Sequence, residues 1–358
     1  MAMPLRLAAF NVENLFARAR VLNCADNSQG DRLLAQVQEL QAELARAAYD
    51  KPAILRLYRA LKDYVGVVEV RGKLFARRGF AAVGVKANGR ADWEGWLEFK
   101  REEFAEPAVE NTAAVLRAMA ADIVGLVEVE SRPVLERFAT RKLQGLGYGF
   151  NMLIDGNDDR GIDVGLLSRF PLRRLRSHIH DTRGRSRIFS RDCLEVEVEL
   201  PNGRSLFLLL NHFKSKGYGV TARSSARRRL QAETVARILA ANYNLERDLV
   251  AVCGDLNDTP GSGPLKPLLG LPHLHDVLAL KFAAAADRWT YSYGQRQQID
   301  YLLVSEPLRA MWWDAGVERR GIFGLEKLTG GQARSFPSVD RPTHAASDHG
   351  AVWADFEL

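Results

Sequence analysis

Several apolar segments of this 358-residue chain end at, or begin just after, a side chain that could bind a metal ion or move a proton. Four segments, 5–10, 122–127, 205–210 and 249–253, run into such residues, and two more, 301–304 and 351–356, directly follow them. The polar residues at these positions are Asn11, Glu128, Asn211, His212, Asp255, Asn257, Asp300, Asp348 and His349. If the last two segments are strands that run opposite to the first four, all of these side chains reach the same edge of a sheet sandwich.

Carboxylates that crowd together repel one another unless a cation or a proton joins them. Clusters of oxygen ligands suit Mg²⁺ or Mn²⁺, which are held by a few carboxylates together with water and substrate phosphate. A histidine beside an aspartate adds a group that titrates near neutral pH. The set therefore fits metal-assisted attack of water on phosphorus.

Each of these residues also has an ordinary structural interpretation. Asn11 could cap a turn, Asp300 could lie on the surface, and His212 could be a hydrogen-bonded core histidine. Glu128 could be a solvated charge like Glu130. It is their occurrence together, each attached to an apolar segment, that favours a site.

The segments that carry these residues resemble strands with few helices between them. Residues 193–200 alternate apolar and acidic side chains, which is the period of a half-exposed strand. The following Pro201-Asn202-Gly203 predicts a hairpin to the segment 205–210. Helices are expected near 111–120 and 224–240, so the pattern predicts an α/β protein in which two packed sheets carry helices outside.

Residues from about 19 to 105 differ from the rest and are expected to form a mostly helical insertion. Apolar side chains at helical spacing predict helices near 33–44 and 54–61. Val67–Val70 and Ala81–Val85 are expected to pair as a small hairpin. We expect scaffold or lid packing here rather than a separate catalytic unit.

Composition narrows the possible partners. The net charge of +6 and the pI near 9.3 favour phosphate-rich partners such as nucleic acid or anionic headgroups. No run of 18 apolar residues predicts a membrane span.

The three cysteines, Cys24, Cys193 and Cys253, are far apart and fit buried thiols in a reducing compartment. No signal peptide is recognisable, so a cytoplasmic location is expected, although a trimmed export signal would leave the same sequence.

The polar residues above and their neighbours, in their order, resemble the endonuclease/exonuclease/phosphatase superfamily, which includes exonuclease III and DNase I-like proteins. The resemblance covers about three quarters of the chain and omits the insertion. It is carried by Asn11-Val12-Glu13-Asn14, Leu126-Val127-Glu128-Val129, Gly161-Ile162-Asp163-Val164-Gly165-Leu166-Leu167-Ser168-Arg169, Asn211-His212-Phe213, Gly254-Asp255-Leu256-Asn257, Ile299-Asp300-Tyr301 and Ser347-Asp348-His349. Many members have glutamine before the metal-binding glutamate, whereas this chain has Val127.

The resemblance implies a four-layered α/β sandwich in a single domain, 1–358, and a division of roles. Glu128 resembles the principal metal ligand, with Asp348 and Glu13 as further ligands of Mg²⁺ or Mn²⁺. Either Asp255 or His349, the latter oriented by Asp300, would act as the base. Asn257 and His212 would contact phosphate, and Asn11 would contact either phosphate or metal-bound water.

Two basic regions bear on the substrate. Eight arginines and one acid lie between Arg169 and Arg191, and Lys214, Lys216 and Arg227–Arg229 follow His212. A solvated surface is as good an interpretation as a phosphate-binding one, except where Lys214 and Lys216 adjoin Asn211 and the proposed site. Tyr218, Tyr291 and Tyr293 could stack bases, although packing is the commoner use.

Three functions therefore remain open from the sequence. The leading hypothesis is a nuclease that acts on DNA or RNA. The second is a phosphatase or phospholipase that acts on inositol phosphate or sphingolipid headgroups, because the superfamily uses one core for all of these substrates. The third is a non-catalytic binding module, against which the complete set of acids, asparagines and histidines argues. No GxxxxGK[ST] or GxSxG motif is present to support motor or esterase chemistry.

Overall fold

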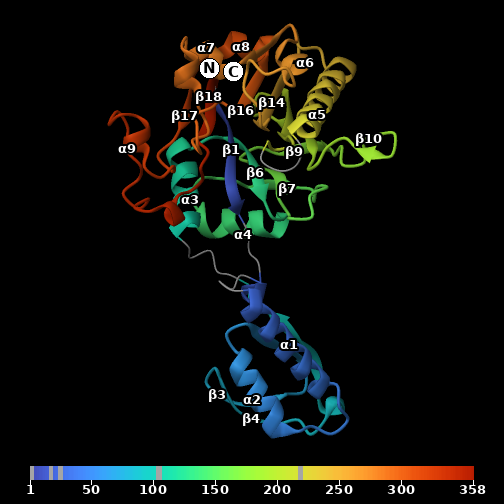
Figure 1. The fold of residues 1–358 in the computed structure, drawn as a ribbon. Coiled ribbons are helices and arrows are strands. Elements are labelled where there is room, and N and C mark those ends of the chain that lie inside the picture. The colour runs from blue at the N-terminus through green and yellow to red at the C-terminus, as the bar shows by residue number, and fades with distance from the viewer. Residues whose placement is uncertain (1–3, 16–18, 23–26, 102–106, 217–220) are drawn as a thin grey trace. The chain divides into compact units, whose positions relative to one another are not determined.

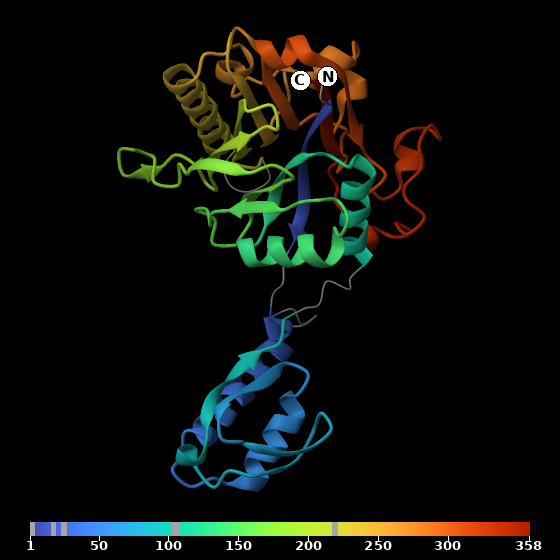
Figure 2. The same cartoon turned by 180° about the vertical axis from the view of Figure 1, so that it is seen from behind.

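The computed structural model describes residues 4–15, 19–22, 27–101, 107–216 and 221–358. The chain divides into two compact units. The main unit comprises Met1–Phe16 and Phe104–Leu358, and the inserted unit comprises Ala17–Glu103. Figures 1 and 2 show the chain from opposite sides.

The first sheet of the main unit has six strands in the order β17-β18-β1-β6-β8-β7. The two central strands, β1 and β6, are parallel, and every other neighbouring pair is antiparallel. The strands span β1 (Pro4–Leu15), β6 (Ile123–Val129), β7 (Phe150–Leu153), β8 (Asp163–Ser168), β17 (Trp312–Glu318) and β18 (Ala351–Glu357).

The second sheet repeats this plan with six strands in the order β15-β16-β14-β13-β12-β9. Its central strands, β13 and β14, are parallel and the remaining pairs are antiparallel. The strands span β9 (Leu172–Arg176), β12 (Cys193–Glu199), β13 (Ser205–His212), β14 (Leu249–Asp255), β15 (Leu274–Asp276) and β16 (Asp300–Ser305). A separate two-stranded hairpin is formed by β10 (Thr182–Arg183) and β11 (Ser186–Arg187).

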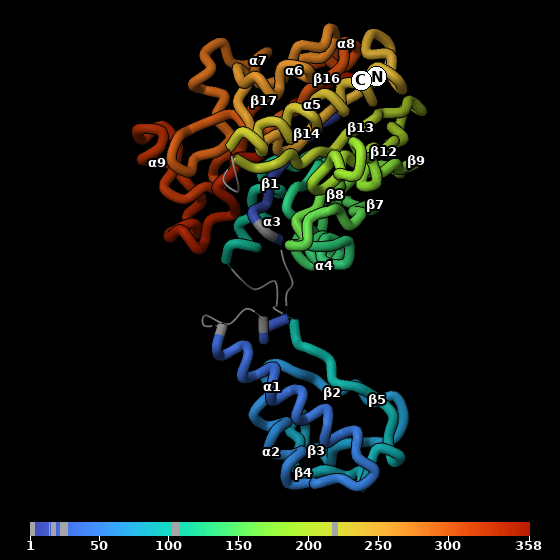
Figure 3. Tube along the Cα trace, turned by 45° about the vertical axis from the view of Figure 1, so that its right-hand side comes forward, coloured from blue at the N-terminus to red at the C-terminus, as the bar shows by residue number. Residues whose placement is uncertain are grey.

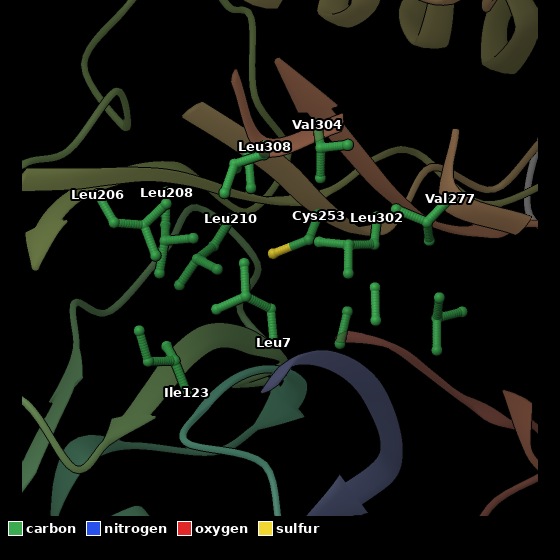
Figure 4. Close-up of a cluster of buried hydrophobic side chains, with 14 of the residues drawn as sticks. Leu7, Ile123, Leu206, Leu208, Leu210, Cys253, Val277, Leu302, Val304 and Leu308 are labelled. Atoms are coloured by element: carbon green, nitrogen blue, oxygen red, sulfur yellow. The ribbon is translucent and has the colours of Figure 1, made fainter. Parts of the chain in front are cut away.

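The apolar faces of the two sheets pack against each other. Leu7 and Ile123 from the first sheet meet Leu208, Cys253 and Leu302 from the second in one buried cluster (Figure 4). In β12, apolar and acidic side chains alternate, and this fixes which face of the strand is buried. Leu194, Val196 and Val198 enter this core, while the intervening glutamates face away. Cys193 and Cys253 are both buried free thiols, as the sequence predicts.

Helices cover the outer faces of both sheets. The long helix α5 (Thr221–Asn242) buries Val235 and Leu239 against β13 and β14, beside which it lies in Figure 3. α3 (Pro107–Met119) and α4 (Arg132–Lys142) contact the first sheet. Shorter helices complete the unit at α6 (Lys266–Leu269), α7 (Val277–Lys281), α8 (Glu306–Met311), α9 (Leu325–Leu328), η3 (Ala285–Arg288) and η4 (Pro342–His344). The main unit is therefore the expected four-layered α/β sandwich of two mixed sheets.

The inserted unit has a hydrophobic core of its own, to which Leu40, Ile54, Leu61 and Trp93 contribute. It contains η1 (Arg20–Leu22), α1 (Asn27–Leu44), α2 (Lys51–Leu61), β2 (Val65–Arg71), β3 (Phe75–Arg78), β4 (Ala81–Val85), η2 (Arg90–Asp92) and β5 (Glu94–Phe99). Both expected helices are present. The two ends of the unit are joined by a bridge between Ala19 and Arg101.

The expected pairing of Val67–Val70 with Ala81–Val85 is wrong. β2 pairs instead with β5, and β4 pairs with β3. A tight turn at Gly79, whose φ is 60°, gives the nearby β3 the shorter connection to β4.

Among the described helices, none combines the length and the apolar character needed to cross a bilayer.

Candidate active site

The strand directions bring the predicted polar residues to one edge of the sandwich. β16 and β18 run antiparallel to β14 and β1, and Asp255 lies opposite Asp300 in the register. His212 is in register with Asp255 on the other side. The side chains surround a cavity of about 290 Å³ that is lined by Asn11, Glu13, Glu128, Arg160, Ile162, Arg191, His212, Ser215, Lys216, Asp255, Asn257, Tyr291, Gln297, Ile299, Asp348 and His349.

The carboxylates of Glu13, Glu128 and Asp348 line this cavity, and the charge of Asp348 adds to the effect of burial in raising the pKa of the other two. Burial and the nearby Asp348 carboxylate together raise the pKa of Glu13 to about 7. Burial also raises the pKa of Glu128 and that of Asp348. The backbone N–H of Asp348 donates to Glu13 Oε2 at 2.9 Å, which links the end of β1 to the loop before β18. Carboxylates that resist ionisation in this way form a site that a divalent cation would stabilise.

Asp255 is held by amide donors at the end of β14. Asn257 donates to it twice, from its backbone N–H at 2.7 Å and from Nδ2 at 3.0 Å. Asn11 Nδ2 donates to Asp255 Oδ2 at 3.3 Å and lies 3.5 Å from Glu128 Oε1. Burial and the neighbouring Asp300 raise the pKa of Asp255, so this carboxylate exchanges its proton closer to neutrality than an exposed aspartate.

His349 is hydrogen bonded to Asp300, with Nδ1 2.8 Å from Asp300 Oδ2. Thr290 Oγ1 donates to the same oxygen at 2.6 Å, which fixes the carboxylate. Burial alone would lower the pKa of His349, but the charge and the hydrogen bond of Asp300 outweigh it and raise the pKa to about 10. The imidazole is therefore protonated at neutral pH and presents Nε2 as a donor.

Asp255, Asp300 and His349 also place one ligand atom each within 4.8 Å of one another. The Asp300 oxygen nearest to His349 already accepts hydrogen bonds from the imidazole and Thr290. This group could hold a metal ion, but its Asp300–His349 contact is already that of a hydrogen-bonded pair.

His212 has the opposite protonation. Burial, reinforced by the nearby Arg191 cation, lowers its pKa well below the usual value. Its Nε2 lies 3.8 Å from both Glu128 Oε1 and Asp255 Oδ2. A neutral imidazole in this position can bind an oxygen atom without adding charge.

Two arginines of the cavity were not predicted from the sequence. Arg191 is almost fully buried, its Nε lies 3.2 Å from Asp158 Oδ2, and its Nη1 donates to Phe213 O at 3.3 Å. Arg160 binds the same Asp158 carboxylate through Nε and Nη2. Both lie beside segments with strand patterns, 161–169 and 193–200, but nothing in the sequence indicates that their side chains face the cavity. Thr290 was also missed as a neighbour of the pair. Tyr291, named from the sequence as a possible base-stacking residue, lines the cavity, and its ring lies 4.8 Å from that of His349.

Not every predicted residue lines the cavity. Asn211 is buried within β13 and its Nδ2 donates to Leu209 O, so it points away from the cavity. Asp300 lies behind His349. The backbone N–H of Lys214 donates to Gln231 Oε1, and Lys214 does not line the cavity. Lys216 does line it, and its Nζ lies 3.0 Å from Asp258 Oδ1. Tyr218 lies outside the described residues, and the exposed Tyr293 does not line the cavity.

The basic cluster Arg227–Arg229 does not form a continuous phosphate-binding surface. Arg228 is 3% exposed and its guanidinium binds Asp258 Oδ2 at 2.9 Å. Arg229 pairs with Glu233 one helical turn away. Because α5 turns by about 100° per residue, three consecutive arginines cannot all face one ligand.

The backbone at the site is strained. Glu13, Glu128 and Asn257 have φ values of 46°, 69° and 55°. Of the other described non-glycine residues, Ala120 and His273 also have positive φ, and they lie away from the cavity. Such conformations cost about 1–3 kcal/mol each and cluster at functional sites. A Cβ on Gly254 would lie 2.0 Å from Asn211 O, which explains the glycine directly before Asp255.

Comparisons with known proteins bear on the family and the fold of the main unit. A profile of the Endonuclease/Exonuclease/phosphatase family matches residues 101–349. An AP endonuclease from Archaeoglobus fulgidus superposes with a TM-score of 0.50 at 15% identity, over 70% of this chain and 94% of that one. TDP2 from Caenorhabditis elegans, in truncated form, gives a TM-score of 0.48 at 18% identity, over 70% and 90% of the two chains. An endonuclease/exonuclease/phosphatase from Beutenbergia cavernae gives 0.49 at 20% identity, over 70% and 66%. No curated protein sequence matches the chain.

Proposed function

Because the chain belongs to the Endonuclease/Exonuclease/phosphatase family, we propose that it is a divalent-metal-dependent phosphodiesterase that cleaves nucleic acid. The observation that carries this proposal is the convergence of Glu128, Asp255 and His349, from three different segments, on one cavity that also contains Arg191. Acids, a protonated histidine and a buried arginine together suit an anionic phosphodiester, and a nucleic-acid strand is a polymer of such diesters.

The cation would be held by Glu128 and Asp348, with Glu13 at the mouth of the cavity. Their oxygen atoms suit Mg²⁺ or Mn²⁺, and the raised pKa of each carboxyl group fits a site that carries too much negative charge on its own. When bound, the ion would polarise the phosphate and neutralise charge that develops on its oxygens.

Asp255 is the proposed general base. Its two oxygens are fixed by Asn257 and Asn11, so it can take a proton from water in a defined direction. His349 is the weaker candidate for a base because it already carries a proton at neutral pH. Its proposed role is to stabilise the charge on phosphate oxygen, or to protonate the leaving group, through Nε2.

Arg191, Asn257 and the neutral His212 are proposed to hold the remaining phosphate oxygens. The Arg191 Nε is buried and makes no hydrogen bond of good geometry among the described residues. A guanidinium in that state gains strongly from a phosphate that binds two of its N–H groups. The inserted unit is proposed to be a structural addition to a single catalytic domain, in keeping with its separate core.

The test is a comparison of Glu128→Ala with Glu130→Ala. Glu130 is the next acid along the chain and does not line the cavity. Wild type and Glu130→Ala are expected to cut plasmid DNA, single-stranded DNA or RNA with Mg²⁺ or Mn²⁺ and to stop with EDTA. Glu128→Ala should lose activity and calorimetric Mn²⁺ binding while it keeps its fold.

Two results would contradict the proposal. Unchanged Mn²⁺ binding by Glu128→Ala would remove the assigned ligand. Turnover of inositol phosphates or sphingomyelin, without any cleavage of nucleic acid, would assign the site to headgroup substrates instead.

A further inference from the structure

The arginines between positions 169 and 191 are of two kinds. Five of them form ion pairs with carboxylates: Arg169 with Asp122, Arg173 with Glu199, Arg174 with Glu197, Arg176 with Glu195 and Arg191 with Asp158. Arg183, Arg185 and Arg187 are exposed, and no carboxylate of the described residues lies within ion-pair distance of them. Most of the positive charge of this stretch is thus neutralised, and the remainder is concentrated on one short segment.

That segment is the hairpin β10–β11, which we call the basic arm. It turns at Gly184, whose φ is 62°, and Arg183 pairs with Ser186 in its two-stranded ladder. Figures 1 and 2 both show the arm projecting from the side of the main unit beyond β9. A hairpin that projects into solvent with arginines and without apolar side chains has no packing function of its own.

A groove lies at the base of the arm, between it and α5. Its volume is about 490 Å³, and its walls include Arg176, His180, Asp181, Thr234 and Arg237. Arg187 extends the cationic character, since its Nη1 contacts His180 Nδ1 at 2.5 Å and donates to Ile179 O. Asp181 is the one acid among the lining residues, and it is bound to His178 at 2.7 Å.

The base of the arm is tied to the catalytic cavity. Asn157 Nδ2 donates to Ile179 O, three residues before the arm, and to Phe189 O, two residues after it. The adjacent Asp158 binds both Arg160 and Arg191 at the cavity. The arm and the cavity therefore belong to one hydrogen-bonded framework.

We propose that the basic arm and its groove bind the sugar–phosphate backbone of a nucleic-acid strand at phosphates away from the one that is cleaved. The inference rests on the proposed function and deepens it, because it makes the substrate a polymer rather than an isolated headgroup. Arginine binds phosphate through a bidentate fork, and each contact releases counterions, which makes the affinity depend on salt. Since phosphate contacts do not read bases, the arm adds affinity without sequence preference.

The experiment compares Arg183→Gln/Arg185→Gln with Arg173→Gln/Arg174→Gln. Both double variants remove two positive charges from neighbouring positions, but the control pair is already neutralised by Glu199 and Glu197. Binding of a single strand and a duplex is measured across a salt series, with Ca²⁺ in place of Mg²⁺ to limit turnover. The arm variant is expected to lower the slope of log affinity against log salt by about 1.4 to 1.8, for two lost contacts, and the control variant by less than half of that.

Two further measurements accompany the binding series. Hydrolysis of bis(p-nitrophenyl) phosphate, a small diester that cannot reach the arm, should be the same in wild type and in the arm variant. Thermal melting should also agree, because Arg183 and Arg185 are exposed. Together they separate a binding defect from damage to the site or to the fold.

Equal salt slopes for wild type and the arm variant, with normal cleavage of nucleic acid by both, would overturn the proposal that the arm binds phosphates. The proposed function would be unaffected by that result. If wild type hydrolyses the small diester but neither binds nor cuts nucleic acid, both proposals fail. A loss of binding to vesicles of phosphatidylcholine and phosphatidylserine, with unchanged nucleic-acid slopes, would make the arm a membrane contact and also overturn it.

Discussion

Individual side chains of the cavity differ in protonation although they lie within a few ångströms of one another. His349 is held protonated by Asp300, His212 is held neutral by burial, and Asp255 has a raised pKa. These differences follow from partners and burial, not from residue type. In the proposed mechanism they divide binding, proton removal and charge stabilisation among residues that a sequence shows only as acids and histidines.

We expect Asp300→Asn to move the pH profile of the reaction to lower pH. Loss of the carboxylate charge removes the interaction that raises the pKa of His349, so this imidazole would deprotonate at a lower pH. It also removes the neighbour that raises the pKa of Asp255, so the acid limb moves in the same direction. The maximal rate should fall by about 10² or more, in line with general acid–base contributions.

Measurement of kcat/KM against pH with a soluble diester checks this expectation, together with an NMR titration of His349. The variant should still fold, since asparagine can accept the hydrogen bond from Thr290. An alkaline limb at the same pH as in wild type would show that the imidazole does not depend on Asp300.

The strained backbone at Glu128 predicts a separation of stability from activity. Glu128→Gly and Glu128→Ala both remove the carboxylate, and both should be inactive. Only glycine adopts a φ of 69° without steric cost, so Glu128→Gly should be more stable by about 1–2 kcal/mol. Urea unfolding of the two variants measures the difference, and equal stability would mean that the backbone relaxes when the side chain is lost.

At the scale of elements, apolar patterns predicted the strands that form the centre of each sheet. β6, β8, β13, β14 and β16 are buried nearly throughout, so their sequences carry a clear signal. The strands β7, β9, β15 and β17 were missed because they are short or lie at the edges, where polar side chains such as Arg173 and Arg174 are tolerated.

Pairing and cavity lining were harder to predict than the strands themselves. Val67–Val70 has a strand pattern, but the pattern does not indicate which strand pairs with it. The observed partner, β5, lies in a charged stretch around Trp93 and Trp96 that was not predicted to be a strand. Acids at strand ends could be predicted because their position is fixed by the strand. Arg160 and Arg191 could not, because their loops are placed only by tertiary contacts such as that to Asp158.

The junction of β9 and β12 provides a pH-dependent test. His178 is almost fully buried, with Nε2 2.7 Å from Glu195 Oε1 and Nδ1 2.7 Å from Asp181 Oδ2. Although burial opposes both shifts, these contacts raise the pKa of His178 above 6.5 and lower the pKa of Glu195 below 4.5. The histidine stabilises the fold fully below 6.5 and loses this effect as pH rises through its raised pKa. Glu195 contributes above 4.5 and loses its effect as pH falls through its lowered pKa.

His178→Gln should therefore lower the free energy of unfolding most between pH 4.5 and 6.5, by about 1–3 kcal/mol, and less at alkaline pH. Urea unfolding in that pH range and at alkaline pH checks the sign of the change. His273→Gln is the matched control, because His273 pairs with Glu246 on the surface and should contribute little. A penalty for His178→Gln that does not change with pH would indicate that only packing is lost.

At the scale of the whole molecule, the inserted unit is separable in its construction. It has its own core, and its ends are joined by the Ala19–Arg101 bridge and a hydrogen bond from Arg20 N to Lys100 O. A short glycine–serine linker in place of residues 17–103 should leave the main unit folded and able to hydrolyse bis(p-nitrophenyl) phosphate. The measurement is a single cooperative melting transition with unchanged turnover of this small diester, and a chain that aggregates would show that the main unit needs the insertion.

The pairing of β1 with β18 also sets the order of events during synthesis. Pro4 lies opposite Glu357 in the register, so the sheet that contains β1 is complete only after β18 has been synthesised. Asp348 and His349 immediately precede β18, and Asn11 lies in β1. A nascent chain therefore carries the acids of its cavity without the surface that assembles them, and pairing across so long a separation is slow. If the proposed activity is correct, the chain gains it only after β18 has paired with β1.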